Sequence, residues 1–405
     1  MFLMYFTEQP MSAYPEDEGR KFGATALMFS NKHFDPIAGS RLYNERLAEY
    51  MLAEEVGFDA IMLNEHHTAP YCMQPRMPVW SSILAATTQR VKIAQLGNPL
   101  PTSDNPIQIA EEIAMIDMIS KGRLISGIVR GAGTEQLANN VNPAYNRERF
   151  EEAHDLLIKI FTEPGPFRWE GNHYQFRVVN PWAVPMQKPH PRIWVPGVVS
   201  METVIWAAQH RYPYIALNTT IEATKKIWEV YDKAALEVGY EAGTEQRGYL
   251  IRCHVSDTEE KALANGRQFM WMQGEFTGLG HPVWGGPSGY SSPAGRRQRL
   301  MAPKRAANPY EKQLDEMTII AGTPKQVIQK LKVIMEETRP GIFALWGNDG
   351  NVNHEDSKTC IRLMGQEVLP ALRDIAKGLG LKDPFELDTP VSLKETPKSQ
   401  LRVPA

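Results

Sequence analysis

Residues 91–131 read VKIAQLGNPLPTSDNPIQIAEEIAMIDMISKGRLISGIVRG and place two apolar runs on either side of a helical pattern. The runs at 91–96 and 124–130 are almost uninterrupted, which predicts strands buried on both faces of a parallel sheet. Between them, Asn105 can cap a helix over 106–120, in which isoleucines recur at helical spacing. Asp117 falls on the apolar stripe of this helix, and we expect it to act structurally, by an ion pair or caps within the turn that follows, with Arg123 as a candidate partner. The stretch therefore predicts one strand–helix–strand unit.

The same alternation extends along the whole chain. Including the two runs above, apolar segments predict strands at 2–6, 59–63, 91–96, 124–130, 193–195, 214–217, 249–255 and 342–346. Amphipathic segments predict helices at 41–56, 106–120, 147–161, 201–210, 222–238, 257–270, 324–337 and 355–377. Eight strands alternating with helices predict an α/β protein built as a (β/α)8 TIM barrel with insertions. An open doubly wound sheet, which alternates in the same way, is the alternative.

The domain organisation follows from the chain length and from the segments that do not fit a minimal barrel. We expect one domain over 1–380 and a C-terminal tail over 381–405. The stretch 162–191 contains PGPFRWEGNHYQF, which predicts a small hairpin followed by a proline-rich return. The stretch 271–320 combines glycine, proline and aromatic residues, and we expect it to form a lid over the active site. A static loop packed at a subunit interface is the alternative.

Composition excludes several classes of protein. The 405 residues carry a net charge of -3 and contain no long basic stretch, so nucleic acid is not expected as a partner. No run of about 18 apolar residues is present, and the first ten residues read as a strand rather than a signal peptide. The cysteines Cys72, Cys253 and Cys360 have neither metal-ligand nor disulfide spacing. We therefore expect a cytoplasmic protein that acts on a small molecule.

Polar residues follow the second strand, at the end of the barrel where the active site of such a fold lies. Residues 64–67 read NEHH. A histidine titrates near neutral pH and can donate a hydrogen bond to a developing anion. His66 and His67 are therefore candidate catalytic residues, unless they serve only the backbone of their loop.

The third strand runs into Gly97 and Asn98, followed by two prolines that restrict the next turn. A glycine allows another group to approach the backbone closely. Gly97 and Asn98 are therefore candidates for ligand binding, and a rigid turn without a ligand is the alternative.

The fourth strand ends in Arg130, which is followed by the small residues Gly131 and Ala132. An arginine at the end of an apolar strand needs an anion, and small residues let backbone N–H groups point at the same anion. After the fifth strand, Ser200 stands at the start of a helix that contains Thr203, and such a helix end favours phosphate. A salt bridge for Arg130 and a plain helix cap for Ser200 are the alternatives. One phosphate between adjacent strands would satisfy both.

At these residues the chain resembles the bacterial luciferase-like flavin-dependent monooxygenases, in particular their alkane-monooxygenase-like branch. The matching segments are EEVGFDAIMLNEHH, LGNPLPTSDNPIQIAEEIAMIDMISKGRLISGIVRG, NRERFEEAHDLLIKIF, SMETVIWAAQH and GTPKQVIQKL. They occur in the family's order and cover most of 1–260 and 318–375. Each segment alone is weak, whereas the combination is specific.

The resemblance implies a two-component enzyme. A separate reductase would deliver reduced FMN, and oxygen would add to it to form a flavin hydroperoxide that oxidises a small organic substrate. His66 matches the family's catalytic histidine and Arg130 a ligand of the flavin phosphate, while Ser200 and Thr203 match phosphate-binding positions. The Leu96–Gly97 bond lies where the family often has a cis peptide beneath the flavin ring. The family also implies a homodimer.

One position departs from the family pattern. Luciferase has a reactive cysteine just before the arginine of this turn, and this chain has Val129 there. The difference argues against light emission and leaves oxygenation open. The alternatives are a deazaflavin-dependent hydride-transferring oxidoreductase and a non-catalytic flavin-binding subunit. A metal-dependent hydrolase using His66 and His67 is a third, but it would need further ligands at the strand ends.

Overall fold

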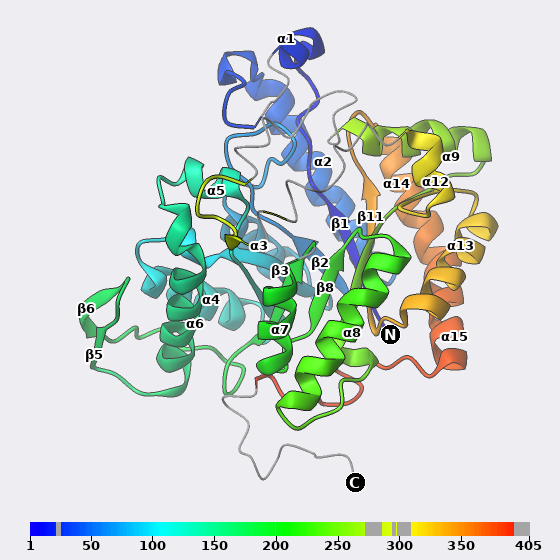
Figure 1. Ribbon diagram of the computed structural model, residues 1–405. Coiled ribbons are helices and arrows are strands. Elements are labelled where there is room, and N and C mark those ends of the chain that lie inside the picture. The colour runs from blue at the N-terminus through cyan, green and yellow to red at the C-terminus, as the bar shows by residue number, and fades with distance from the viewer. Residues whose placement is uncertain (22–25, 199, 272–285, 294–296, 298–308, 393–405) are drawn as a thin grey trace.

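The computed structural model describes residues 1–21, 26–198, 200–271, 286–293, 297 and 309–392 (Figure 1). Its strands are β1 (Phe2–Thr7), β2 (Ala60–Leu63), β3 (Lys92–Pro99), β4 (Leu124–Val129), β5 (Phe167–Glu170), β6 (Gln175–Val179), β7 (Arg192–Gly197), β8 (Tyr214–Leu217), β9 (Arg247–Val255), β10 (Ile319–Gly322) and β11 (Ile342–Asn348). Its helices are α1 (Glu16–Lys21), α2 (Pro36–Glu55), α3 (Met77–Thr87), α4 (Pro106–Ile119), α5 (Gly133–Ala138), α6 (Asn146–Thr162), α7 (Met201–Gln209), α8 (Ile221–Glu237), α9 (Glu259–Gly266), α12 (Tyr310–Asp315), α13 (Pro324–Thr338), α14 (His354–Leu363) and α15 (Leu369–Leu379). None of these helices is long and apolar enough to cross a membrane.

Eight parallel strands close into a barrel, which confirms the predicted (β/α)8 fold. The order around the barrel is β1, β2, β3, β4, β7, β8, β9 and β11, and β11 pairs with β1 to complete the ring. These strands lie at the eight predicted positions. The additional strand β10 pairs with the C-terminal half of β9, on the edge whose N-terminal half pairs with β8.

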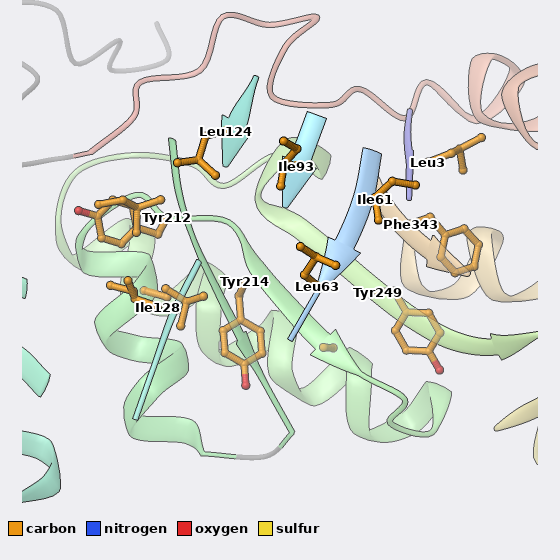
Figure 2. Packing of buried hydrophobic residues seen from close by; sticks show 14 of the residues in the cluster. Leu3, Ile61, Leu63, Ile93, Leu124, Ile128, Tyr212, Tyr214, Tyr249 and Phe343 are labelled. Carbon is orange, nitrogen blue, oxygen red and sulfur yellow. The ribbon is translucent and has the colours of Figure 1, made fainter. Parts of the chain in front are cut away.

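Side chains alternate between two apolar layers, which explains why the strands read as almost continuous apolar runs. One layer fills the barrel and includes Met4, Trp194 and Trp346. The other lies between barrel and helices, and Figure 2 shows part of it, with Leu3, Leu63, Ile93, Leu124, Tyr214, Tyr249 and Phe343 among the labelled residues. Burying one large apolar side chain contributes roughly 1.5–3 kcal/mol, so both layers hold the strand ends in place.

Outside the eight barrel strands, the structure agrees with the sequence-based prediction in part. The stretch 162–191 contains the expected hairpin, formed by the antiparallel strands β5 and β6. The single helix expected at 355–377 is divided into α14 and α15 by a π-helical turn at Met364–Val368. The helices α1, α3, α5 and α12 and the short strand β10 were not predicted.

The predicted lid falls largely outside the described residues. Within 271–320, the structure describes 271, 286–293, 297 and 309–320, which include α12 and the start of β10. From the predicted tail, Phe385 packs against Phe2 at a ring-centroid distance of 5.0 Å and against Trp194 at 6.3 Å. The described part of that stretch therefore covers the N-terminal end of the barrel.

Candidate active site

The predicted site residues gather at one end of the barrel, because the C-terminal ends of parallel strands meet there. His66 follows β2, Gly97 and Asn98 lie at the end of β3, Arg130 follows β4 and Ser200 follows β7. Figure 1 shows α1 and α5 at this end, opposite the N-terminus.

His66 is held by a carboxylate that the sequence analysis did not identify. Its Nδ1 lies 3.0 Å from Oε1 of Glu135, a buried residue of α5. The other carboxylate oxygen of Glu135 accepts a hydrogen bond from the backbone N–H of His67 at 3.2 Å. The His66 ring lies against Tyr71, at a centroid distance of 5.3 Å, and 27% of its side chain remains exposed. The imidazole is therefore fixed on one edge and open to a ligand elsewhere.

The surroundings of His66 favour its charged form. Burial alone would lower the pKa of His66, but the hydrogen bond to Glu135 and the nearby Glu8 and Glu65 outweigh burial and raise the pKa to about 9. An imidazolium at neutral pH can donate a proton or stabilise a negative charge.

His67 faces a different acid. Its Nε2 lies 3.2 Å from Oε1 of Glu65, whose other oxygen accepts a hydrogen bond from the backbone N–H of Met77 at 2.8 Å. Arg76 also lies 3.5 Å from Glu65. This cluster connects the histidine loop to the start of α3, so His67 has the contacts of a structural residue.

A buried polar group lies behind the histidine loop. Asn64 donates a hydrogen bond to Glu8, and its carbonyl oxygen accepts one from Gln74 at 2.9 Å. Burial raises the pKa of Glu8. Glu8 directly follows β1, so its position at a strand end was the signal that could have identified it.

Arg130 and Ser200, expected to share one anion, do lie together. Arg130 donates from Nη1 to Asn146 Oδ1 at 2.8 Å and from Nη2 to Ser200 Oγ at 3.1 Å. Within the described part of the chain no carboxylate forms an ion pair with Arg130, and the nearby Glu202 pairs with Arg147 at 2.7 Å instead. Burial lowers the pKa of Arg130. The salt bridge considered as an alternative for Arg130 is therefore not found among these residues.

The hydroxyl of Ser200 does not cap its own helix. Ser200 is the N-cap residue of α7, yet its side chain makes no capping hydrogen bond and instead accepts one from Thr203 Oγ1 at 3.0 Å. Two hydroxyls and one guanidinium thus meet at the N-terminus of α7, where the helix dipole favours an anion.

Tyr290, from the 271–320 stretch, forms one wall of this candidate anion site. Its hydroxyl donates a hydrogen bond to the carbonyl oxygen of Gly131 at 2.6 Å, and its ring lies 5.4 Å from the Arg130 guanidinium. Beside them is an open cavity of about 830 Å³, lined in part by Asn146 and Arg147. Nothing in the sequence connected Tyr290 with this turn. Tyr290 and Gly131 are 159 positions apart, and only the fold brings them together.

The residues around Arg130 fit a phosphate group. The guanidinium has no carboxylate partner among the described residues, and Ser200 and Thr203 add two hydroxyls. Gly131 has a φ of 74°, and a β-carbon there would meet Glu135 and Pro99 side chains at 3.3 Å. Both the left-handed backbone and the close side chains therefore favour glycine in the turn that presents these groups.

Gly97 lies where β3 and β4 approach closely. The Leu96–Gly97 peptide is cis. A β-carbon on Gly97 would lie 2.9 Å from the carbonyl carbon of Gly127, and one on Gly127 would lie 2.1 Å from the carbonyl oxygen of Gln95. The Asn98 amide donates to Gln95 Oε1 at 3.2 Å and to the Gly127 carbonyl at 3.1 Å, so it connects β3 and β4.

A metal-dependent reaction finds no support in the arrangement of the two histidines, since each faces its own carboxylate. In the described residues, no three His, Cys, Asp or Glu side chains are grouped so that they could hold a metal ion.

The chain is thus a TIM barrel that carries His66 and the Arg130–Ser200 pair at the C-terminal end of its strands. The family model described as luciferase-like monooxygenase matches residues 26–340. The chain belongs to the luciferase-like monooxygenase family, which confirms the predicted family and its class of flavin-dependent monooxygenases.

Curated relatives agree with this assignment. The chain is 25% identical over 350 residues to the oxygenase component of a flavin-dependent trigonelline monooxygenase of Acinetobacter baylyi, covering 84% of this chain and 92% of the relative. It is 24% identical to an alkanal monooxygenase alpha chain of Photobacterium leiognathi and 30% identical to an uncharacterised protein of Sinorhizobium fredii. Those two matches cover 54% and 45% of this chain, and 61% and 52% of the relatives' lengths.

Solved structures share the fold. The monooxygenase RslO1 of Streptomyces bottropensis superposes with a TM-score of 0.67 at 23% identity, over 92% of this chain and all of that one. The oxygenating constituent of 3,6-diketocamphane monooxygenase of Pseudomonas putida, in complex with FMN, gives 0.66 at 20% identity, over 82% and 93%. An F420-dependent secondary alcohol dehydrogenase gives 0.59 at 16% identity, over 82% and 95%.

Proposed function

We propose that the protein is the oxygenase of a two-component monooxygenase, which uses reduced FMN and O2 to oxidise a small organic substrate. The observation that carries this proposal is the meeting of Arg130 with Ser200 at 3.1 Å, on the same barrel end as His66. A guanidinium and two hydroxyls at a helix N-terminus suit the terminal phosphate of FMN.

Each part of the site has a role in this proposal. Arg130, Ser200, Thr203 and the turn at Gly131 and Ala132 would hold the phosphate, and Gly97 and Asn98 would bind the rest of the flavin. Bound reduced FMN supplies two electrons, so that one oxygen atom of O2 reaches the substrate and the other leaves as water.

His66 is the proposed catalytic residue. Its Nδ1 is occupied by Glu135, which leaves Nε2 as the ring nitrogen available to a ligand. The charged imidazole would hold a proton at Nε2 that it could donate during the reaction. Aromatic and apolar side chains at the barrel end would exclude water from the reaction.

The proposal includes a reductase partner, because reduced FMN has to be supplied from outside the barrel. The Acinetobacter relative is named as the oxygenase component of its enzyme, which supports this arrangement. We further propose a homodimer that works in the cytoplasm.

One experiment tests the function directly. The protein is titrated with FMN, riboflavin and the deazaflavin F420, and is then supplied with reduced FMN, O2 and a panel of small organic substrates. We expect FMN to bind much more tightly than riboflavin, and a product that gains one oxygen atom derived from O2. Binding of F420 without binding of FMN would instead establish the hydride-transferring alternative, and FMN binding without any product would favour a non-catalytic subunit.

A further inference from the structure

We propose that Glu135 is a positioning residue for His66, which fixes the proton of the imidazole at Nδ1 and so directs Nε2 to the substrate side. This inference rests on the proposed catalytic role of His66. Glu135 belongs to neither of the motifs that identified the site, and it reaches the histidine from α5.

The geometry of Glu135 is determined from two sides. One carboxylate oxygen lies 3.0 Å from His66 Nδ1, while the other accepts the backbone N–H of His67 at 3.2 Å. Because the backbone of the histidine loop orients the carboxylate, the carboxylate in turn orients the ring. Glu135 is 1% exposed, so water does not compete for these contacts.

The position of α5 extends this contact to the anion site. The helix begins at Gly133, directly after the turn of Arg130, Gly131 and Ala132. The backbone N–H of Glu135 donates to the carbonyl oxygen of Ala132 at 3.1 Å. The short helix therefore connects the residues proposed to bind phosphate with the proposed catalytic histidine.

The chemistry of the contact determines which nitrogen acts. A carboxylate accepts hydrogen bonds but cannot donate them, so Nδ1 must carry a proton in both the neutral and the charged imidazole. The neutral form then has its lone pair at Nε2, and the charged form has a second proton there. In either form His66 can exchange a proton with a ligand through Nε2 alone.

Three acidic side chains and one phenol surround His66: Glu8 after β1, Glu65 and Tyr71 in the histidine loop, and Glu135 on α5. Glu8 bonds to Asn64, and Glu65 is engaged by His67 and Met77. Of the described carboxylates, Glu135 is the one hydrogen-bonded to the imidazole of His66.

The test is a nuclear magnetic resonance titration of His66 in the cofactor-free protein, followed through its ring nitrogens. Glu135→Gln should lower the titration midpoint of His66 by about 1 pH unit or more, since an opposite charge at this distance has that effect. Glu148→Gln removes the acid beside His173 on the surface, 2.9 Å away, and should leave His66 unchanged. Glu135→Asp keeps the negative charge, so its His66 midpoint should lie between those of Glu135→Gln and the parent.

Turnover provides the second measurement. At high pH, reduced FMN should be oxidised without forming product. In Glu135→Gln this uncoupling should begin at a lower pH than in the parent, in line with the lowered midpoint of His66. An unchanged midpoint in Glu135→Gln and Glu135→Asp, with both variants folded, would overturn the positioning role. A lowered midpoint in a protein that oxygenates no substrate would keep the positioning role and reject the proposed function.

Discussion

Nη2 of Arg130 lies 3.1 Å from Oγ of Ser200, although the two residues are 70 positions apart in the sequence. Arg130 follows β4 and Ser200 follows β7, and these strands are neighbours in the barrel. The contact brings a half-buried positive charge to the start of a helix. Two sequence signals that were weak separately therefore meet at one place, as the proposed phosphate site requires.

Replacing Arg130 with alanine should weaken FMN binding. A charge-assisted hydrogen bond contributes about 1.5–3 kcal/mol, so the affinity should fall roughly 10- to 150-fold. Riboflavin, which has no phosphate, should bind equally to the variant and the parent. Arg168→Ala, in the exposed hairpin, is the matched control and should leave both affinities unchanged. Calorimetric titration measures these values, and equal FMN affinity in Arg130→Ala would remove Arg130 from the phosphate site.

His66→Ala should separate flavin binding from substrate oxidation. We expect the variant to keep much of its FMN affinity but to convert reduced FMN and O2 into hydrogen peroxide instead of product. His67→Ala should be milder, because His67 faces Glu65 and the start of α3 rather than Glu135. The ratio of peroxide to product measures the effect, and full coupling in His66→Ala would rule out its catalytic role.

Oxygenation and stability should both depend on the charge of His66. Because the pKa of His66 is raised from 6.5 to about 9, the imidazolium is present at neutral pH and is lost as the pH rises through about 9. Its contribution to stability is complete below about pH 6.5 and disappears through about pH 9. Denaturant unfolding of the parent and His66→Ala across this range should therefore show a difference that narrows with rising pH. A difference that widens would contradict the assignment.

Tyr290→Phe tests the wall of the anion site. The variant loses the hydrogen bond to the Gly131 carbonyl but keeps the ring beside Arg130. A neutral hydrogen bond contributes about 0.5–1.5 kcal/mol, so we expect FMN affinity to fall roughly 2- to 12-fold. Tyr290→Ala should weaken binding further, since it also removes the ring. Tighter FMN binding in either variant would show that Tyr290 blocks the site instead of forming it.

A buried ion pair behind the barrel end should contribute strongly to stability. Glu49 on α2 is fully buried and pairs with Arg46, and it also accepts hydrogen bonds from His354 at 2.8 Å and Asn348 at 3.1 Å. Breaking such a pair leaves an uncompensated charge, so Glu49→Ala should lower the free energy of unfolding by about 3–5 kcal/mol. Glu45→Ala, on the same helix and beside exposed Arg41, should cost less than about 1 kcal/mol. Similar losses in the two variants would contradict this interpretation.

The sequence predicted those features that have a local or periodic signal. The eight barrel strands are apolar on both faces, and His66, Arg130 and Ser200 all lie within three residues of a strand end. Glu135 was missed, and so was the contact of Tyr290, one of the aromatic residues of the predicted lid, with Arg130, because both contacts arise only when distant segments meet.

Asp117 illustrates the same limit. We expected it to act within its own turn, with Arg123. Instead it accepts hydrogen bonds from Gln187, at 2.8 Å from the backbone and 2.6 Å from the side chain. Arg123 donates to backbone carbonyls of Ala85, Thr88 and Val91. The expectation of a structural role agrees with these contacts, whereas the expected partner was wrong.

The close approach of Gly97 and Gly127 bears on how this enzyme would be redesigned. A β-carbon at either glycine would press into the neighbouring strand, at 2.9 Å and 2.1 Å from backbone atoms. Libraries that aim at new substrates should therefore keep both codons fixed. Diversity is better placed at positions such as Tyr71, whose ring lies beside His66 without supporting the sheet.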